Sequence, residues 1–264
     1  MEDSPVTAIR EKKDSSMVVG LNLLKKKEVD GFVSAGNSGA LLAGGTLIVG
    51  RLKGVERAAL TPIIPTKKGY SLLIDCGANM DAKPSYLHQF AKIGSIYMEE
   101  CLGVKNPKVG LINIGTEEEK GNSLTKETFP LLKADESINF IGNIEAREIP
   151  SGEADVLVCD AFVGNVILKF MEGFGNWVFS MVKTEFTRNV TTKFAGLLMK
   201  KGVGNIKNKF YYNDKGGAPM LGLKGMVVKI HGNSKDIEMS SAILQIDTFI
   251  ENDLVGKIAS RLEQ

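Results

Sequence analysis

The feature that most constrains the fold is a repeated pairing of a short apolar run with a helical pattern. Each apolar run ends in glycine or asparagine, and a segment with apolar residues at helical spacing usually follows it. The runs are nearly continuous, which is typical of strands buried on both faces of a parallel sheet. We therefore expect one α/β unit over residues 1–264, with a mostly parallel sheet and helices on both faces. The segments that hold these runs are 30–39, 70–79, 108–115, 138–145, 154–165 and 225–234.

Helical spacing of apolar residues places the predicted helices between these runs. In residues 83–102 the side chains of Tyr86, Phe90, Ile93 and Tyr97 fall on one face. A final helix is predicted from about 235 to 262, with three isoleucines, Ile243, Ile246 and Ile250, on its inner face. The chain begins on a basic, helix-like segment without a preceding strand, so either the fold starts with a helix or an N-terminal portion is missing. The remaining helices are predicted over 40–52, 124–134 and 166–186.

Composition excludes several classes of protein. The net charge of +2 argues against a dedicated nucleic-acid binder. Three cysteines without a C-x-x-C pair indicate reduced thiols in the cytosol. The first residues are charged and contain no apolar signal sequence. Residues 31–50 carry no charge, but six glycines and Asn37 argue against a membrane span there.

The turn from Ser34 to Gly39, which contains Gly36, Asn37 and Ser38, is the first candidate site. Glycines let backbone N–H groups converge on a ligand, and the following helix presents its positive end, so the turn could hold a phosphate. A tight strand-to-helix turn capped by Asn or Ser is the alternative. Neither standard nucleotide-binding fingerprint is present.

A second polar cluster follows the apolar run that ends near residue 75. Asp75, Asn79 and Lys83 could orient a polar substrate and neutralise an anion. The same residues are also ordinary turn formers. No histidine lies near the aspartates, so we expect no metal there.

Two further strand ends carry polar residues. Lys120 lies in an acidic loop and could be an anion ligand, although such loops are more often solvated surface. Asp160 ends another apolar run, Asn165 opens the helix after it, and Lys169 lies further along that helix. This arrangement repeats that of the Ser34–Gly39 turn.

The two histidines and the cysteines offer the remaining chemistry. His88 falls within a predicted helix and is expected to be structural, whereas His231 follows a strand and could donate a proton or bind phosphate. A nucleophilic pair of His231 with Cys76 or Cys159 is possible. Apolar neighbours favour buried, inert thiols instead.

Residues 183–212 form a basic amphipathic stretch. Apolar residues recur at helical spacing among lysines, which suits an anionic membrane surface or an acidic protein partner. Packing on the chain's own domain or on a second copy is the alternative. The residues predicted to meet a membrane are Phe194, Leu197, Leu198, Lys200 and Lys201.

Seven strings follow one another from near Ser4 to the C-terminus. They are KKDSSM, SAGNSGALL, DCGANMDAKP, VGLINIGTEEEKGN, INFIGNIEAR, DAFVGNVILK and KIHGNS. In their order and spacing these strings together resemble the bacterial phosphate acyltransferase (PlsX) family. The family usually has threonine where Ser38 stands, which keeps the hydroxyl.

The resemblance implies transfer of an acyl group from acyl carrier protein to inorganic phosphate, for phosphatidic acid synthesis. It also implies a fold like isocitrate and isopropylmalate dehydrogenases and phosphotransacetylase, a homodimer, and a cytoplasmic protein peripherally associated with the membrane. No cofactor and no metal are needed.

Under this hypothesis the predicted site residues take roles. The Ser34–Gly39 turn, Lys83, Lys120 and Lys169 would hold phosphate. Asn79, Asn165 or His231 would donate hydrogen bonds to the oxyanion. Asp75 and Asp160 would orient those donors.

Two other readings remain open from the sequence. One is a nicotinamide-dependent dehydrogenase of the same fold, and the other is a binding module without turnover. The second reading arises because members of the family begin with a glycine-rich strand and further residues that this chain lacks, so we expect an N-terminally truncated chain.

Overall fold

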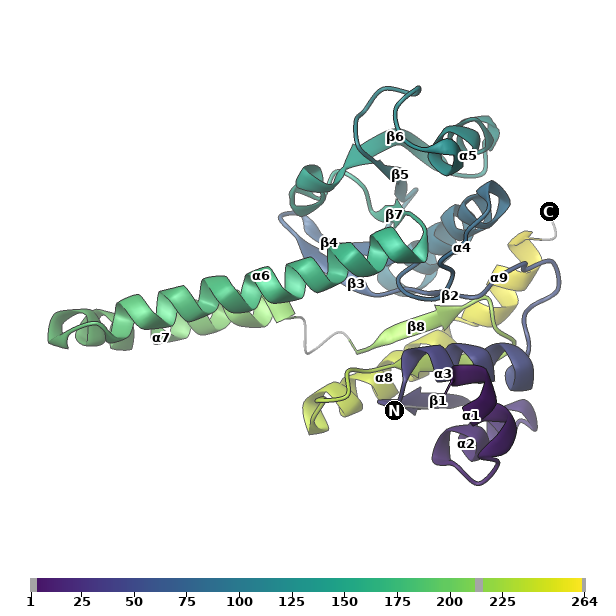
Figure 1. Cartoon of the computed structure of the whole chain (residues 1–264), viewed down its shortest axis with the longest axis horizontal. Coiled ribbons are helices and arrows are strands. Elements are labelled where there is room, and N and C mark those ends of the chain that lie inside the picture. Colours follow the sequence, from purple (N-terminus) through teal and green to yellow (C-terminus); the bar gives the residue numbers. More distant parts are fainter. Residues whose placement is uncertain (1–3, 212–215, 263–264) are drawn as a thin grey trace.

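A computed structural model describes residues 4–211 and 216–262 of the chain (Figure 1). Two β-sheets form the body, and the strand order is β1-β9-β8-β2 in one and β3-β4-β7-β5-β6 in the other. The strands are β1 (Gly31–Ser34), β2 (Ala59–Leu60), β3 (Ile63–Thr66), β4 (Gly69–Ile74), β5 (Lys108–Asn113), β6 (Asn139–Glu145), β7 (Val156–Val158), β8 (Ala218–Leu221) and β9 (Met226–Lys229).

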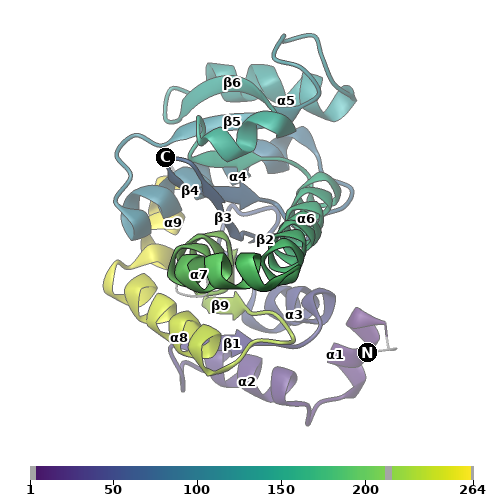
Figure 2. The same ribbon diagram turned by 90° about the vertical axis from the view of Figure 1, so that its left-hand side faces the viewer.

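The helices surround these sheets, as the two perpendicular views show (Figures 1 and 2). A π-helical turn over Gly45–Val49 continues α3, and a 3-10 turn over Ala146–Ser151 follows β6. The helices are α1 (Pro5–Glu11), α2 (Ser16–Lys25), α3 (Ser38–Gly44), α4 (Pro84–Leu102), α5 (Ser123–Ala134), α6 (Ala161–Thr187), α7 (Val190–Tyr211), α8 (Asp236–Glu251) and α9 (Leu254–Leu262).

The five-stranded sheet is buried on both faces, as its continuous apolar runs predict. Leu72 and Ile74 of β4 pack in the cluster that contains α4, whereas Leu73 between them packs in the cluster that includes the start of α6. Successive strand residues point to opposite faces, so both faces need cover. The prediction of helices on both faces is therefore confirmed for this sheet.

Helix α4 lies at the centre of the largest core cluster. Phe90, Ile93 and Tyr97 are almost completely buried. Pro84 stands in its first turn, and Gly103 ends it in the left-handed conformation, with its N–H donated to the Glu99 carbonyl. Proline at the start and glycine at the end are typical helix boundaries.

The sheets are mixed, and this corrects the expectation of one mostly parallel sheet. Strands β4, β7, β5 and β6 run parallel to one another, and β1 runs parallel to β9. However, β3 pairs antiparallel with β4, and β8 pairs antiparallel with both β2 and β9. The turn between β3 and β4 spans only Lys67 and Lys68, which is long enough for a hairpin but not for a parallel crossover.

The predicted C-terminal helix is also divided. It breaks at Asn252 and Asp253, where Asp253 has a φ of 46° and α9 begins at the next residue. On α8, Ile246 is buried as predicted. The prediction was wrong for Ile243 and Ile250, whose side chains are 56% and 44% exposed. Side chains three or four apart share a face only broadly, so Ile246 alone of the three reaches the core.

Helices α6 and α7 form a hairpin whose far half projects from the body (Figure 1). Gly175 of α6 lies very close to the Phe210 ring of α7. A Cβ on this glycine would stand 2.1 Å from a ring carbon of Phe210. The predicted basic stretch thus begins in the last turns of α6 and continues through α7. None of the described helices is long and apolar enough to cross a bilayer.

Candidate functional site

A cleft of about 820 Å³ lies where the carboxyl ends of strands from both sheets meet. Ser38 follows β1 and His231 follows β9, whereas Gly77 follows β4 and Asn165 follows β7. Ligands of α/β proteins bind at such strand ends, because the loops there are free to carry polar groups.

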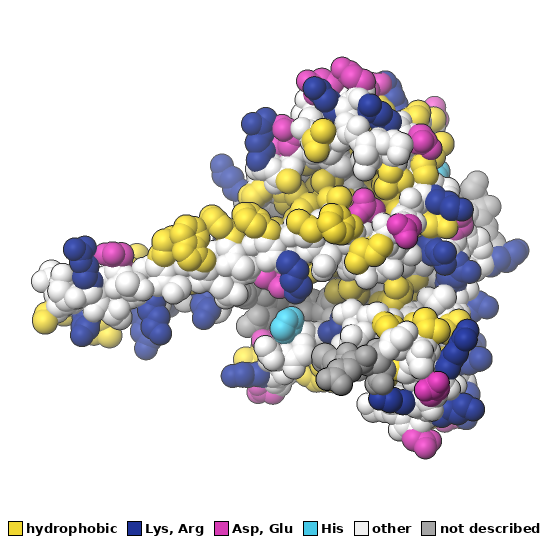
Figure 3. All heavy atoms as spheres, in the orientation of Figure 1, with side chains coloured by type: hydrophobic (Ala, Val, Ile, Leu, Met, Phe, Trp, Pro, Cys, Tyr) yellow, Lys and Arg dark blue, Asp and Glu magenta, His cyan; other side chains and the backbone are white. Residues whose placement is uncertain are grey.

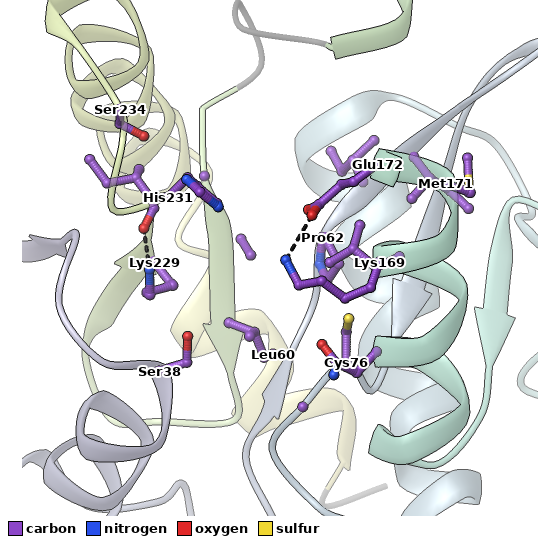
Figure 4. A pocket seen from close by; sticks show the side chains of 18 of the residues that line it. Ser38, Leu60, Pro62, Cys76, Lys169, Met171, Glu172, Lys229, His231 and Ser234 are labelled. Carbon is purple, nitrogen blue, oxygen red and sulfur yellow. Dashed lines mark hydrogen bonds and ion pairs between the residues drawn. The ribbon is translucent and has the colours of Figure 1, made fainter. Parts of the chain in front are cut away.

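The two walls of the cleft differ in character (Figure 4). Ser38, Lys229, His231 and Ser234 line one side. Lys169 and Glu172 of α6 line the other, next to an apolar surface. That surface is made by Leu60, Pro62, Ile63, Ile64, Leu168 and Met171. The cleft is therefore lined by polar and charged groups next to a hydrophobic surface.

His231 is held in one orientation of its ring. The backbone N–H of Asn233 donates to Nδ1 of His231 at 3.2 Å. In the neutral ring the proton then lies on Nε2, which makes Nε2 a hydrogen-bond donor. His231 is exposed at the cleft, so a ligand can reach this donor.

The two lysines in the described lining of the cleft have different partners. Lys169 Nζ lies 2.7 Å from Glu172 Oε2 and forms an exposed ion pair with that carboxylate. Lys229 Nζ donates to the carbonyl oxygen of Ile230. Burial, and then the charge of Lys169, lower the pKa of Lys229 from its ordinary value.

Asp75 stands beneath the cleft and joins the two sheets. Its carboxylate accepts hydrogen bonds from the backbone N–H groups of Leu60 at 2.9 Å, Cys76 at 2.6 Å and Asn79 at 2.7 Å. The Nδ2 of Asn79 donates to the same carboxylate at 2.7 Å. Burial of the carboxyl raises its pKa to about 6 despite these four donors. Asp75 thus fixes the turn after β4 against β2 of the other sheet.

The first turn of α6 approaches this turn very closely. Asp160 caps the helix by accepting from the Val163 N–H at 2.9 Å. A Cβ on Gly164 would lie 2.0 Å from the backbone carbonyl oxygen of Asp75, so only glycine fits there. This contact places Asn165 beside Gly77 in the cleft.

The cysteines do not have the environment of nucleophiles. Burial, and then the charge of Asp75, raise the pKa of Cys76 to about 12. Burial likewise raises the pKa of Cys159, whose thiol contacts the Asp75 carbonyl at 3.5 Å. A nucleophilic cysteine needs a lowered pKa, so these thiols favour the inert alternative.

Comparison with known proteins decides which family this arrangement belongs to. A family described as "Fatty acid synthesis protein" matches residues 1–257. The phosphate acyltransferase of Alkaliphilus oremlandii is 53% identical over 98% of this chain and 77% of its own length. The phosphate acyltransferase of Clostridium novyi is 52% identical over 99% of this chain and 79% of its own length. The chain belongs to the phosphate acyltransferase (PlsX) family.

Solved structures show the fold of this family member. A phosphotransacetylase from Streptococcus pyogenes matches with a TM-score of 0.59 at 15% identity, over 93% of this chain and 74% of the other. The EutD phosphotransacetylase from Staphylococcus aureus matches with a TM-score of 0.57 at 16% identity, over 92% and 74%. The phosphotransacetylase-like part of the fold prediction is confirmed. The likeness to isocitrate and isopropylmalate dehydrogenases stays a prediction.

The site residues predicted for this phosphate acyltransferase fall into groups. Four of them line the cleft: Ser38, Asn165, Lys169 and His231. Four others lie where β1 ends and α3 begins. There Asn37 Oδ1 accepts from the Ala40 N–H at 2.9 Å, and the Ser34 hydroxyl accepts from the Gly36 N–H at 3.1 Å. These four are Ser34, Gly36, Asn37 and Gly39.

The other predicted residues lie outside the cleft lining. Lys83 occupies the N-cap position of α4 without a capping bond from its side chain, and its ammonium lies 6.0 Å from the centre of the Tyr86 ring. Lys120 is exposed in the loop between β5 and α5, and its carbonyl accepts from Asn113 Nδ2 at 3.0 Å. Asn79 uses its amide on Asp75 and on the Ala58 carbonyl.

Sequence reasoning missed several cleft residues of this phosphate acyltransferase. Lys229 ends β9 two residues before His231, and its place at the end of an apolar run was the available signal. Glu172 lies one helical turn after Lys169, a spacing that predicts the observed pair. Nothing local marked Pro62 and Ile64 as a cleft wall, because β3 is short and contains proline.

Proposed function

We propose that this chain transfers an acyl group from a carrier-protein thioester to inorganic phosphate within the cleft between the two sheets. The observation that carries the proposal is the pairing of an anion-compatible wall with an apolar wall at the strand ends. Membership of the phosphate acyltransferase family supports the same reaction.

The reaction joins a phosphate oxygen to the acyl carbon and breaks the bond from that carbon to sulfur. Phosphate dianion is nucleophilic, so orientation can supply much of the acceleration without a strong base. Ser38, Lys169 and the N–H groups of the Ser34–Gly39 turn are proposed to bind phosphate. Lys83 and Lys120 receive no direct role, since they lie outside the cleft lining.

The carbonyl oxygen becomes negative in the tetrahedral intermediate and needs donors aimed at it. Asn165 lies at the start of α6, where the helix dipole favours negative charge, and its side chain borders the cleft. His231 is proposed to donate a hydrogen bond from Nε2–H to the departing sulfur, which leaves as a thiolate and takes its proton from solvent. Asp75, Asn79 and Asp160 act as positioning residues, because their bonds fix the turns that carry the donors.

Membrane attachment is proposed for the end of the α6–α7 hairpin. Phe194, Leu197 and Leu198 of α7 are 65%, 67% and 70% exposed, beside Lys200 and Lys201. Apolar side chains flanked by lysines suit an anionic bilayer surface. An acyl phosphate made near the bilayer would be close to membrane enzymes that use it as an acyl donor for lipid synthesis.

A homodimer is proposed along α6. Its exposed apolar residues recur at steps of three or four, so they form one stripe on the helix (Figure 3). A stripe of large apolar side chains is typical of an interface between protein surfaces. Its members are Phe162, Val166, Phe170, Phe174, Trp177 and Met181.

The test of the proposed reaction uses the purified chain with acyl carrier protein thioester and phosphate. We expect hydroxylamine to trap acyl phosphate, with one carrier thiol released for each acyl group trapped. Product should require phosphate, and nicotinamide cofactors should have no effect. Binding of phosphate and thioester without thiol release would reject the reaction and favour a binding module.

A further inference from the structure

The pairing of strands β1 and β9 brings Lys229 to the candidate phosphate turn. In this parallel pair Lys229 lies opposite Ser34, and the Ile230 N–H donates to the Ser34 carbonyl at 3.0 Å. A Cβ on Gly232 would contact the Ala35 carbonyl at 3.8 Å, so the two segments stay adjacent after the strands end. The turn and Lys229 therefore belong to one site, although most of the chain lies between them in the sequence.

Within the described lining of the cleft, Lys229 is the lysine that has no carboxylate partner. The charged or titratable side chains in the described lining are Lys169, Glu172, Lys229, His231 and Glu238, together with the Cys76 thiol. Glu172 is paired with Lys169, and Glu238 Oε2 accepts from the Lys235 N–H at 2.9 Å. Among the described residues no carboxylate lies within ion-pair distance of Lys229.

An anion between the walls would relieve a repulsion between two lysines of the cleft. Lys229 is half-buried and feels the charge of Lys169 from the facing helix, and both effects disfavour its charged form. A doubly charged anion placed between the two ammonium groups would reverse this, because each cation would then face negative charge. Ser38 and His231 border the same space and could donate to the remaining oxygens.

We propose that Lys229 is the principal cation of the phosphate site, and that it binds the attacking phosphate between Lys169 and the Ser34–Gly39 turn. This inference rests on the proposed function for the identity of the anion. The shared chemistry is a phosphate oxyanion, which could come from inorganic phosphate or from the phosphodiester of a carrier's pantetheine arm. We assign it to inorganic phosphate, because a dianion matches two facing ammonium groups better than a monoanion does.

The experiment measures binding of inorganic phosphate by calorimetry without any acyl donor. We expect Lys229→Met to weaken binding about tenfold to a hundredfold, since a charge-assisted hydrogen bond is lost. Lys229→Arg should keep affinity within a few-fold, because it keeps the charge. Lys105→Met, which removes an exposed lysine between α4 and β5, should leave affinity unchanged. Dimethyl phosphate, a phosphodiester monoanion, should bind more weakly than phosphate and should respond less to Lys229→Met.

A second readout separates binding from a structural role. At an alkaline pH where Lys229 is partly deprotonated, wild type should take up protons when phosphate binds, because the anion raises the pKa of Lys229, and Lys229→Met should lose this uptake. Circular dichroism would confirm that the variants are folded. Unchanged phosphate affinity and unchanged proton uptake in folded Lys229→Met would overturn the inference. So would equal weakening in Lys229→Met and Lys229→Arg.

The turnover assay distinguishes this inference from the proposed function. If wild type makes acyl phosphate but Lys229→Met keeps its KM for phosphate, the inference fails and the function stands. If phosphate binding depends on Lys229 but no acyl phosphate forms, the function fails and the anion site stands.

Discussion

The carboxylate of Asp75 accepts a hydrogen bond from the backbone N–H of Leu60 at 2.9 Å, and this bond ties the five-stranded sheet to the four-stranded one. Leu60 closes β2, which pairs with β8, whereas Asp75 directly follows β4. Leu60 and Cys76 line the cleft, so the buried carboxylate holds together two of the segments that border it.

Asp75 should make stability fall as the pH rises through the weakly acidic range. Its pKa is about 6 in the folded chain and 3.8 without burial, so the folded state binds the extra proton between these values. Stability falls with pH wherever the folded state binds more protons, by about 3 kcal/mol in total for this shift. Urea unfolding of wild type and Asp75→Asn from pH 4 to 8 measures the effect as a difference.

We expect wild type to lose stability relative to Asp75→Asn between pH 4 and 6, and the difference to level off above about pH 7. Asp75→Asn also replaces one carboxylate oxygen that accepts hydrogen bonds. This loss changes the free energy of unfolding of the variant by the same amount at every pH, so it does not alter the pH dependence. A wild type that gains relative stability over that range would contradict the raised pKa.

Gly164 should not tolerate a methyl group. The Cβ of an alanine there would lie 2.0 Å from the Asp75 carbonyl oxygen, which is a steric clash. We therefore expect Gly164→Ala to destabilise the chain by about 1–3 kcal/mol. On the same helix, a Cβ added to Gly173 would meet no atom within 4 Å, so Gly173→Ala should stabilise by about 0.5–1 kcal/mol. Thermal unfolding compares the two variants, and equal effects would refute the close approach.

How much of the fold could be predicted depended on the sequence pattern in and after each strand. Strong local patterns predicted β1, β4, β5, β6, β7 and β9, because each is an apolar run at a characteristic place beside a turn or a helical repeat. Strands β2, β3 and β8 were missed. Each of them is followed by another strand instead of a helical repeat, and two of them contain proline, so they carry little local signal.

The candidate site divides in a similar way. Polar residues at strand ends, such as His231 and Asn165, were predictable from their position after an apolar run. Lys229 was not, because its importance comes from pairing with a strand far away in the sequence. A phosphate-binding role was predicted for Lys83 from its neighbours in the sequence. In the structure Lys83 lies outside the cleft lining, with its ammonium over the Tyr86 ring.

The end of the hairpin should mediate vesicle binding. Replacing Leu197 and Leu198 together with glutamate should reduce sedimentation with anionic liposomes about tenfold or more, because two exposed leucines lose their apolar contact. Ile114→Glu is the matched control, since Ile114 is 79% exposed in a loop far from α7 in the sequence. Equal binding of all three proteins would exclude the hairpin as the anchor.

The stripe on α6 should mediate self-association. Phe170→Glu with Phe174→Glu places two charges in the stripe, and we expect sedimentation velocity to show monomer where wild type sediments as a dimer. Lys183→Glu changes a charge outside the stripe on the same helix and should leave the dimer intact. A dimer that survives both phenylalanine substitutions would place the interface elsewhere.

The most direct measurement is the rate of acyl phosphate formation by wild type, Asn165→Ala and Lys83→Ala at saturating thioester and phosphate. Asn165 borders the cleft and Lys83 lies outside its lining. We predict that Asn165→Ala lowers kcat about tenfold to a thousandfold through loss of an oxyanion donor, while Lys83→Ala stays within about threefold of wild type. Full activity of folded Asn165→Ala together with loss of activity in Lys83→Ala would contradict the placement of the reaction in this cleft.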